Sequence, residues 1–85
     1  MDRSVEVNVL CFAALREAVG SGSVAVRLGE RATVEDLLAR LGEDYPALTP
    51  YLSYVKVAVN RQFARMTARL RSGDEVALLP PVGGG

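Results

Sequence analysis

The residues whose types and spacing could do chemistry lie at the end of the chain. An apolar run stops there at two prolines, and three glycines follow: Leu79-Pro80-Pro81-Val82-Gly83-Gly84-Gly85. Proline gives no amide hydrogen to a sheet, so a strand should end at this point. Glycine accepts almost any backbone conformation, so this thin segment can enter a slot too narrow for a residue with a Cβ. The sequence favours a functional segment over residues 80–85, with the α-carboxylate of Gly85 as its one reactive group, over the alternative of a loose chain end.

Composition excludes several other kinds of chemistry. The chain has no histidine and a single cysteine, Cys11, which argues against zinc, haem and metal sites and against serine–histidine or cysteine–histidine catalysis. Ten basic and ten acidic residues cancel, so charge gives no case for nucleic acid. No apolar run is long enough for a membrane span, and the N-terminus lacks the features of a signal peptide. We therefore expect a cytoplasmic protein that binds neither nucleic acid nor membrane.

The charges are nevertheless unevenly distributed. Residues 1–50 hold eight acids and five bases, whereas residues 51–85 hold five bases and two acids. Most of the positive charge of residues 51–85 comes from four arginines: Arg61, Arg65, Arg69 and Arg71. Two interpretations stay open, an ordinary solvated face and a surface that meets an acidic partner.

Hydrophobic periodicity predicts the helices and strands that must position residues 80–85. Alternation with period two predicts strands over 5–12, 23–28, 55–59 and 75–79, and places Cys11 in a core row where it packs without reacting. Helical spacing predicts a short helix over 13–19 and a principal helix that begins at Thr33 and ends at Gly42. Asn60 should turn the chain, and the stretch 61–71 fits either a helix face or a short strand followed by a loop.

This order predicts an α+β domain over residues 1–79, with a mixed sheet of four or five strands packed on one principal helix. The last strand should be central because it is apolar on both faces. Apolar residues out of phase with the core remain on the other face. We expect Phe12, Phe63 and Leu79 to form a patch near the start of the C-terminal segment, either as scattered surface hydrophobes or as a binding surface.

Sequence motifs along the chain resemble those of a known family. They are Val9-Leu10-Cys11-Phe12-Ala13, Leu15-Arg16-Glu17, Thr33-Val34, Val59-Asn60 and the ending from Ser72 to Gly85. With them, the chain resembles the ubiquitin-like sulfur carriers of the MoaD/ThiS type, the family that includes the small subunit of molybdopterin synthase. The resemblance covers about residues 5–85 and implies a β-grasp fold, in which 61–65 is a short strand and Leu70 is a buried anchor.

The resemblance also implies a function. An adenylyltransferase of the ubiquitin-activating type would use ATP to form an acyl-adenylate at Gly85, and a persulfide sulfur donor would convert it to a thiocarboxylate. Residues Pro80, Pro81, Val82, Gly83 and Gly84 would insert into the large subunit of molybdopterin synthase, which docks on Phe12, Phe63 and Leu79. Sulfur would then pass to cyclic pyranopterin monophosphate to build the dithiolene of molybdopterin. The resemblance further implies a heterotetramer, in which this chain is a non-catalytic carrier subunit with no permanently bound cofactor.

Three alternatives remain open at this point. A carrier of the same shape could serve thiamine, cysteine or another thio-product. A ubiquitin-like modifier would join Gly85 to protein lysines through an isopeptide bond. A β-grasp interaction module would not use its C-terminal segment at all.

Overall fold

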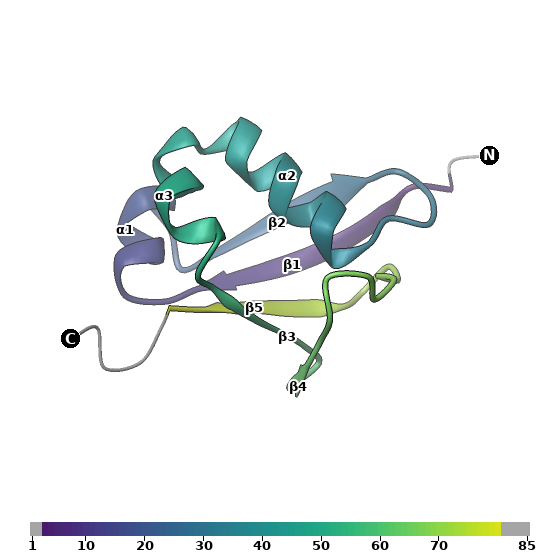
Figure 1. Ribbon diagram of the computed structural model, residues 1–85. Coiled ribbons are helices and arrows are strands. Elements are labelled where there is room, and N and C mark those ends of the chain that lie inside the picture. Colours follow the sequence, from purple (N-terminus) through teal and green to yellow (C-terminus); the bar gives the residue numbers. More distant parts are fainter. Residues whose placement is uncertain (1–2, 81–85) are drawn as a thin grey trace.

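The computed structural model describes residues 3–80, and its elements follow the chain in nearly the expected order (Figure 1). The helices are α1 (Ala14–Val19), α2 (Val34–Asp44) and α3 (Thr49–Leu52), with a short 3₁₀ turn η1 (Pro46–Leu48) before α3. The strands are β1 (Val5–Cys11), β2 (Ser23–Leu28), β3 (Lys56–Val59), β4 (Gln62–Phe63) and β5 (Glu75–Leu79).

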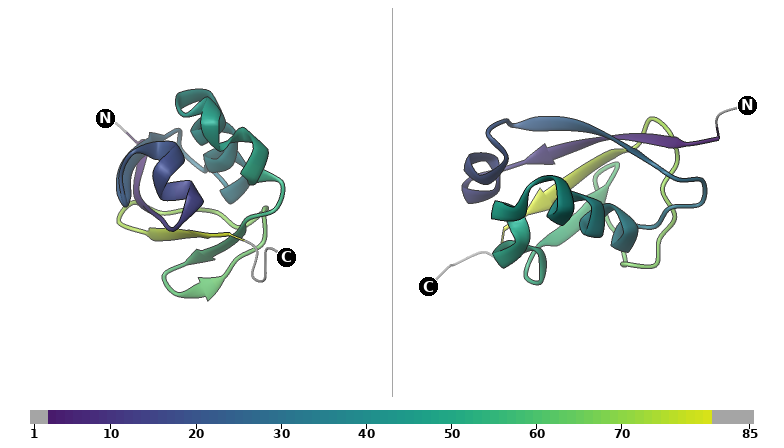
Figure 2. Two further views of the ribbon diagram at one scale, coloured as in Figure 1. Left: turned by 90° about the vertical axis from the view of Figure 1, so that its left-hand side faces the viewer. Right: turned by 90° about the horizontal axis from the view of Figure 1, so that it is seen from above.

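The strands form one mixed sheet in the order β2-β1-β5-β3-β4. Strand β5 is central, as expected, and pairs in parallel with β1 and antiparallel with β3. The other two pairings, β1 with β2 and β3 with β4, are antiparallel. The helices lie together on one face of the sheet, as the end-on view and the view from above both show (Figure 2). The predicted α+β class with a mixed sheet is confirmed.

Alternation along the strands builds the core beneath these helices. Val7, Val9, Val76 and Leu78 are at most 1% exposed, and the apolar stripe of α2 packs onto them. Burying an aliphatic side chain of this size stabilises a fold by about 1.5–3 kcal/mol. Cys11 belongs to the same row and is buried, so its predicted packing role is confirmed.

Helix α2 begins as predicted. The Thr33 hydroxyl accepts a hydrogen bond from the Asp36 amide at 3.3 Å, and the Asp36 carboxylate accepts one from the Thr33 amide at 2.9 Å. This reciprocal cap satisfies two amides that the helix itself leaves without acceptors.

The predicted end of α2 at Gly42 is wrong, because the helix continues to Asp44. The glycine has another role, since a Cβ at Gly42 would lie 3.2 Å from Leu52 Cδ1. It therefore allows α3 to approach α2 closely. The helix ends before Pro46, which disfavours helical geometry in the residue that precedes it.

The ambiguous stretch 61–71 starts as a strand and continues as an extended loop. Asn60 and Arg61 both have positive φ values, 50° and 71°, as a two-residue hairpin turn requires. The carbonyls of Met66 and Ala68 then accept hydrogen bonds from the first-turn amides of α2, at 3.0 and 2.9 Å. Because these two carbonyls accept hydrogen bonds from α2, they do not accept the bonds that a helix over residues 61–71 would need. Leu70 is buried, as the resemblance implied.

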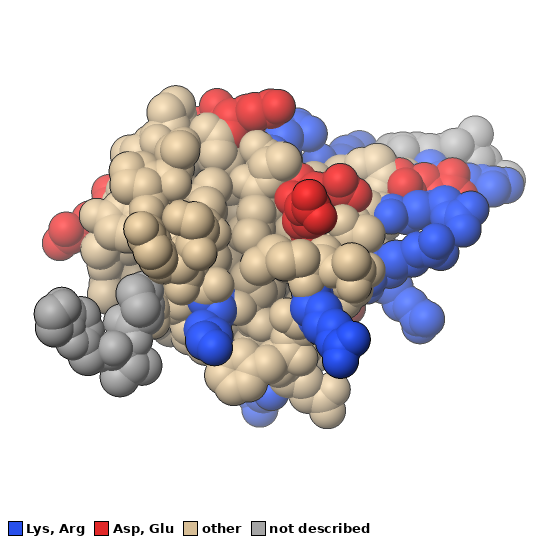
Figure 3. Space-filling model, in the orientation of Figure 1, with Lys and Arg blue, Asp and Glu red and all other residues tan. Residues whose placement is uncertain are grey.

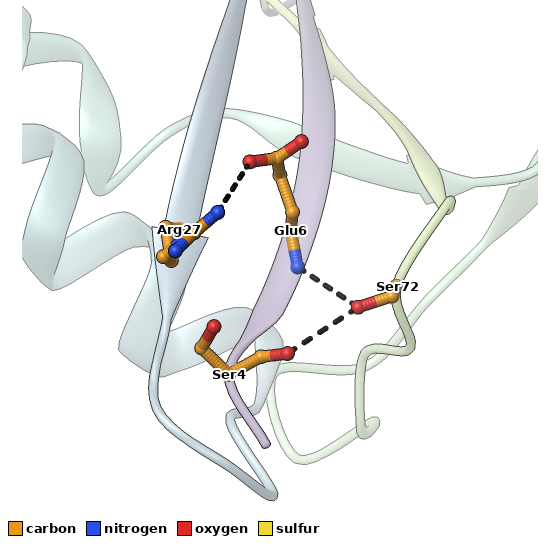
Figure 4. A network of polar contacts seen from close by, with 4 residues as sticks. All are labelled: Ser4, Glu6, Arg27 and Ser72. Carbon is orange, nitrogen blue, oxygen red and sulfur yellow. Dashed lines mark hydrogen bonds and ion pairs between the residues drawn. The ribbon is translucent and has the colours of Figure 1, made fainter. Parts of the chain in front are cut away.

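A polar network fastens the beginning of β1 to the turn before β5 (Figure 4). The Ser72 hydroxyl accepts a hydrogen bond from the Glu6 amide at 3.1 Å and donates one to the Ser4 carbonyl at 3.4 Å. Arg27 on β2 adds an ion pair to Glu6 at 3.4 Å. These contacts hold three segments together at the end of the sheet where β5 begins.

Candidate functional site

The C-terminal segment leaves the domain from the middle of the sheet. Leu79 is the last residue of β5, and the half-buried Pro80 follows it. The predicted site residues Pro81, Val82, Gly83, Gly84 and Gly85 lie outside the described residues. Hydrogen-bonded neighbours flank β5 on both sides, with Cys11 opposite Leu78 on β1 and Lys56 opposite Leu79 on β3. The point from which the segment departs is therefore fixed by two strands.

An apolar row crosses the sheet on the face turned away from the helices, which we call the outer face. Leu10 lies opposite Ala77, Ala77 opposite Ala58, and Ala58 opposite Phe63. Residues directly opposite each other in a sheet point to the same face. Phe63 ends this row and is 76% exposed. Exposing an apolar ring of this size to water is unfavourable, so the row is suited to contact with a protein partner.

A second row on the outer face lies at the C-terminal end of β5. Leu79 is half-buried and lies opposite Lys56 on β3. Phe12 follows directly after β1, one residue beyond the Cys11–Leu78 pair, and is 45% exposed. Leu79 ends β5, and the exposed Phe12 directly follows the neighbouring strand β1, so both residues lie at the same end of the sheet.

A groove joins part of the predicted patch to the start of the C-terminal segment. It has a volume of about 970 Å³, and its lining includes Phe63, Leu79 and Pro80. Phe12 is absent from that lining. The structure therefore brings two of the three predicted docking residues together in one groove and leaves Phe12 on the far side of β5.

Several further residues of the groove, among them Tyr54, Lys56 and Met66, were not anticipated from the sequence. Tyr54 and Met66 lie in loops, before β3 and after β4, and Lys56 and Arg65 add positive charge. Lys56 could have been found from its outward phase between Val55 and Val57. The Met66 carbonyl accepts a hydrogen bond from the Glu35 amide, far away along the chain, whereas the Tyr54 amide donates to the nearby Tyr51 carbonyl.

The side chains of the described residues that could hold a metal ion are carboxylates and one thiol. Among residues 3–80 there is no cluster of three or more histidine, cysteine, aspartate or glutamate side chains that could hold a metal ion. Burial raises the pKa of the Cys11 thiol, because desolvation disfavours the thiolate. The thiol is therefore a poor nucleophile.

Charged side chains are distributed unevenly over the surface. In the view of Figure 3, blue atoms gather at the right-hand end, where β1 begins, and the opposite end is mostly uncharged. Arg61, Arg65, Arg69 and Arg71 are all exposed. Of these four, Arg65 lines the groove. An acidic partner for this set stays a prediction.

No helix among residues 3–80 combines the length and the apolar character needed to cross a membrane.

Comparison with known families matches residues 9–85 to the ThiS family. The molybdopterin synthase sulfur carrier subunit of Chlamydomonas reinhardtii is 37% identical over 83 residues, covering 95% of this chain and 100% of that protein. The protein with the same description from Mycobacterium tuberculosis is 38% identical over 82 residues, covering 95% and 99%. Small archaeal modifier protein 3 of Haloferax volcanii is 36% identical over 92 residues, covering 95% and 100%.

Solved structures agree with the fold. The crystal structure of SAMP1 from Haloferax volcanii has a TM-score of 0.83 and 34% identity, covering 94% of this chain and 99% of that one. A ubiquitin from Caldiarchaeum subterraneum, at 12% identity, has a TM-score of 0.65 and covers 96% and 99%. The ubiquitin-like β-grasp fold expected from the sequence is confirmed.

Proposed function

Because the chain belongs to the ThiS family, we propose that it is a sulfur carrier, the small subunit of molybdopterin synthase. Its Gly85 carboxylate is adenylated, converted to a thiocarboxylate, and used to donate sulfur to cyclic pyranopterin monophosphate. The observation that carries this proposal is the family match, which runs through the whole C-terminal segment to residue 85. Relatives described as molybdopterin synthase sulfur carrier subunits support the same role.

The chemistry follows from the properties of a carboxylate. A carboxylate is a poor electrophile because it is negatively charged and has no good leaving group. An adenylyltransferase of the ubiquitin-activating type uses ATP to join AMP to Gly85, and AMP is a good leaving group. The terminal sulfur of a persulfide donor then displaces AMP and forms an acyl disulfide. A second thiol attacks the donor's sulfur, takes it into a new disulfide, and releases the thiocarboxylate. The sulfur of the resulting thiocarboxylate attacks the pterin precursor inside the large subunit.

Each part of the chain has a distinct task in this scheme. The folded domain is the part that partners bind, and the large subunit docks on Phe12, Phe63 and Leu79 of the outer face. Pro80 and Pro81 limit the conformational entropy lost when the segment is ordered. Gly84 and Gly85 let it enter two different active sites. The groups that catalyse each step belong to the partners.

The decisive experiment is a reconstitution with purified large subunit. Thiocarboxylated chain is mixed with that subunit and cyclic pyranopterin monophosphate, and molybdopterin formation is measured. We expect product with the thiocarboxylate and none with the unmodified carboxylate or with a chain that lacks Gly85. A failure with correctly thiocarboxylated protein would overturn the proposed product, and sulfur delivery by the chain lacking Gly85 would overturn the carrier mechanism.

A second candidate function is protein modification. It is favoured by the similarity to small archaeal modifier proteins of Haloferax volcanii, at 36% and 37% identity. The activated Gly85 would then react with the amine of a target lysine. Conjugates of high mass on a denaturing gel of cell extract would support this function, and intact mass showing an exchange of oxygen for sulfur would support the carrier.

A further inference from the structure

Strand β2 lies at one end of the strand order and pairs with β1, and within residues 3–80 no strand lies on its other side. We call this open side the β2 margin. A marginal strand turns part of its backbone donors and acceptors away from the sheet, where another strand can pair with them. The hydrogen bonds of β1 identify the residues of β2 that do so.

The amides of Glu6 and Asn8 on β1 donate away from β2, to the segment before β5, at 3.1 and 2.9 Å. The residues directly opposite them on β2 are Arg27 and Ala25. In an antiparallel pair, opposite residues either exchange both backbone hydrogen bonds or neither. Arg27 and Ala25 therefore direct their amide and carbonyl groups to the β2 margin, and the same alternation adds Ser23.

Side chains of the same molecule engage these groups at both ends of β2. The Ser21 hydroxyl accepts a hydrogen bond from the Ser23 amide at 3.3 Å and donates one to the Ser23 carbonyl at 2.8 Å. The Arg40 guanidinium on α2 donates to the Arg27 carbonyl at 3.3 Å. Ala25, between them, is exposed, and no residue within 3–80 bonds its outward amide or carbonyl. The β2 margin is thus engaged at both ends and open at its centre.

The side chains of β2 suit a second copy of the same strand in one register. In antiparallel pairing centred on Ala25, the two copies of this residue exchange amide-to-carbonyl hydrogen bonds. Arg27 then lies opposite Ser23 of the second copy, and Val24 lies opposite Val26 on the face that carries the core. A register centred on Arg27 would instead place two guanidinium groups opposite each other, which is destabilising. The strand is therefore complementary to itself about Ala25.

We propose that the β2 margin is a strand-addition site for a second copy of this chain, and that Ser21 and Arg40 restrict its use. With both side chains in place, pairing gains the central bonds at Ala25 but has to displace the contacts at Ser23 and Arg27. The central bonds alone do not offset the entropy lost on association, so the native chain stays monomeric at micromolar concentration. Loss of the two contacts frees the flanking groups and joins two sheets into one.

This site is separate from the proposed function. Strand β2 and the hairpin strand that carries Phe63 stand at opposite ends of the strand order. Pairing at the β2 margin therefore leaves the groove beside Leu79 open, and the inference stands or falls independently of sulfur transfer.

The test compares the native chain with the double variant Ser21→Ala/Arg40→Gln by sedimentation velocity, over a dilution series from millimolar to micromolar concentration. We expect the dissociation constant of the dimer to fall at least about tenfold in the double variant. Hydrogen exchange should show the Ala25 amide protected in the dimer and unprotected in the monomer. The matched control Ser53→Ala/Arg69→Gln removes the same groups away from β2 and should behave as the native chain does.

The pairing geometry is tested by Ala25→Pro in the double-variant background. Proline removes the central donor and is tolerated on a marginal strand, so this variant should return to a monomer, with circular dichroism as the check of folding. Should the double variant unfold, Ser21→Ala and Arg40→Gln are measured singly, and each should strengthen pairing by a smaller factor. The inference is overturned by variants that pair no more tightly than the native chain, by a dimer that persists with Ala25→Pro, or by one that leaves the Ala25 amide unprotected.

Discussion

The side-chain oxygen of Asn60 accepts a hydrogen bond from the Glu75 amide at 3.0 Å, and the Asn60 amide donates one to the Glu75 carbonyl at 2.8 Å. The side-chain nitrogen of Asn60 also donates to Asp74 at 2.9 Å. One residue of the β3–β4 turn thus holds the beginning of β5, the strand that ends at the C-terminal segment.

Replacement of Asn60 should separate its two contributions. Asn60→Ala loses the side-chain hydrogen bonds and forces alanine into positive φ, so we expect a loss of about 2–3 kcal/mol in the free energy of unfolding. Asn60→Gly loses the same hydrogen bonds but tolerates the backbone conformation, so its loss should be about 1 kcal/mol. Urea denaturation measures both. Equal losses in the two variants would contradict a role for the backbone conformation.

Substitutions at Gly42 should depend on side-chain size. Gly42→Ala gains helix propensity of about 1 kcal/mol but brings its Cβ within 3.2 Å of Leu52. Leu52 is half-buried and can move slightly, so the two effects should nearly cancel. Gly42→Val must displace α3, and overpacking costs about 1–3 kcal/mol. Thermal unfolding of the two variants checks this, and a stabilised Gly42→Val would show that α3 is not packed closely.

Phe63 should contribute to binding and not to folding. Its ring is 76% exposed, so Phe63→Ala should change the free energy of unfolding by less than about 0.5 kcal/mol. If the ring anchors the large subunit, the dissociation constant should rise at least about tenfold. Calorimetric titration measures this, with Gln62→Ala on the same strand as the matched control. Unchanged affinity in Phe63→Ala would remove this residue from the docking surface.

Phe12 and Phe63 should act independently in that titration. Strands β5 and β3 separate the strand that leads to Phe12 from the strand of Phe63, which corresponds to about 14 Å across the sheet. Free-energy changes at sites this far apart usually add. The double variant should therefore lose the sum of the two single losses, and a marked deviation would indicate that the partner reorganises.

Cys11 should make stability depend on pH only in alkaline solution. Burial raises the pKa of its thiol above the ordinary value of 9.0, so the unfolded chain ionises first as pH rises. The stabilisation is complete below the ordinary value and is lost as pH rises above it. The stability difference between the native protein and Cys11→Ala should shrink over that range. A constant difference would show that the thiol ionises equally in both states.

Much of the fold was predictable from the sequence, and the exceptions have physical causes. Alternation in β1 requires one covered face, and β5 is apolar on both faces, so the burial of β1 and the central place of β5 were predictable. Gly42 was misinterpreted because glycine serves both as a helix end and as a point of close approach, and the sequence does not show which neighbour arrives. The loop that carries Met66 was ambiguous because its conformation depends on amides of α2, far away along the chain.

The candidate site was predictable to a smaller extent. Phe63 and Leu79 were found because they fall out of phase with the core, which is a local signal. Tyr54 and Met66 have no such signal, and their place in the groove depends on how α3 and the loop after β4 pack. The roles of Gly85 and the five residues before it stay predictions, which rest on the chemistry of the carboxylate and on the resemblance to the family.

The central place of β5 between β1 and β3 has a mechanical consequence. A partner that draws the C-terminal segment into a deep channel applies tension along the axis of β5, with a hydrogen-bonded strand on each side. The interstrand bonds are then loaded in shear and resist together, whereas a strand at the margin would peel away one bond at a time. The domain can thus withstand traction on its end while staying folded.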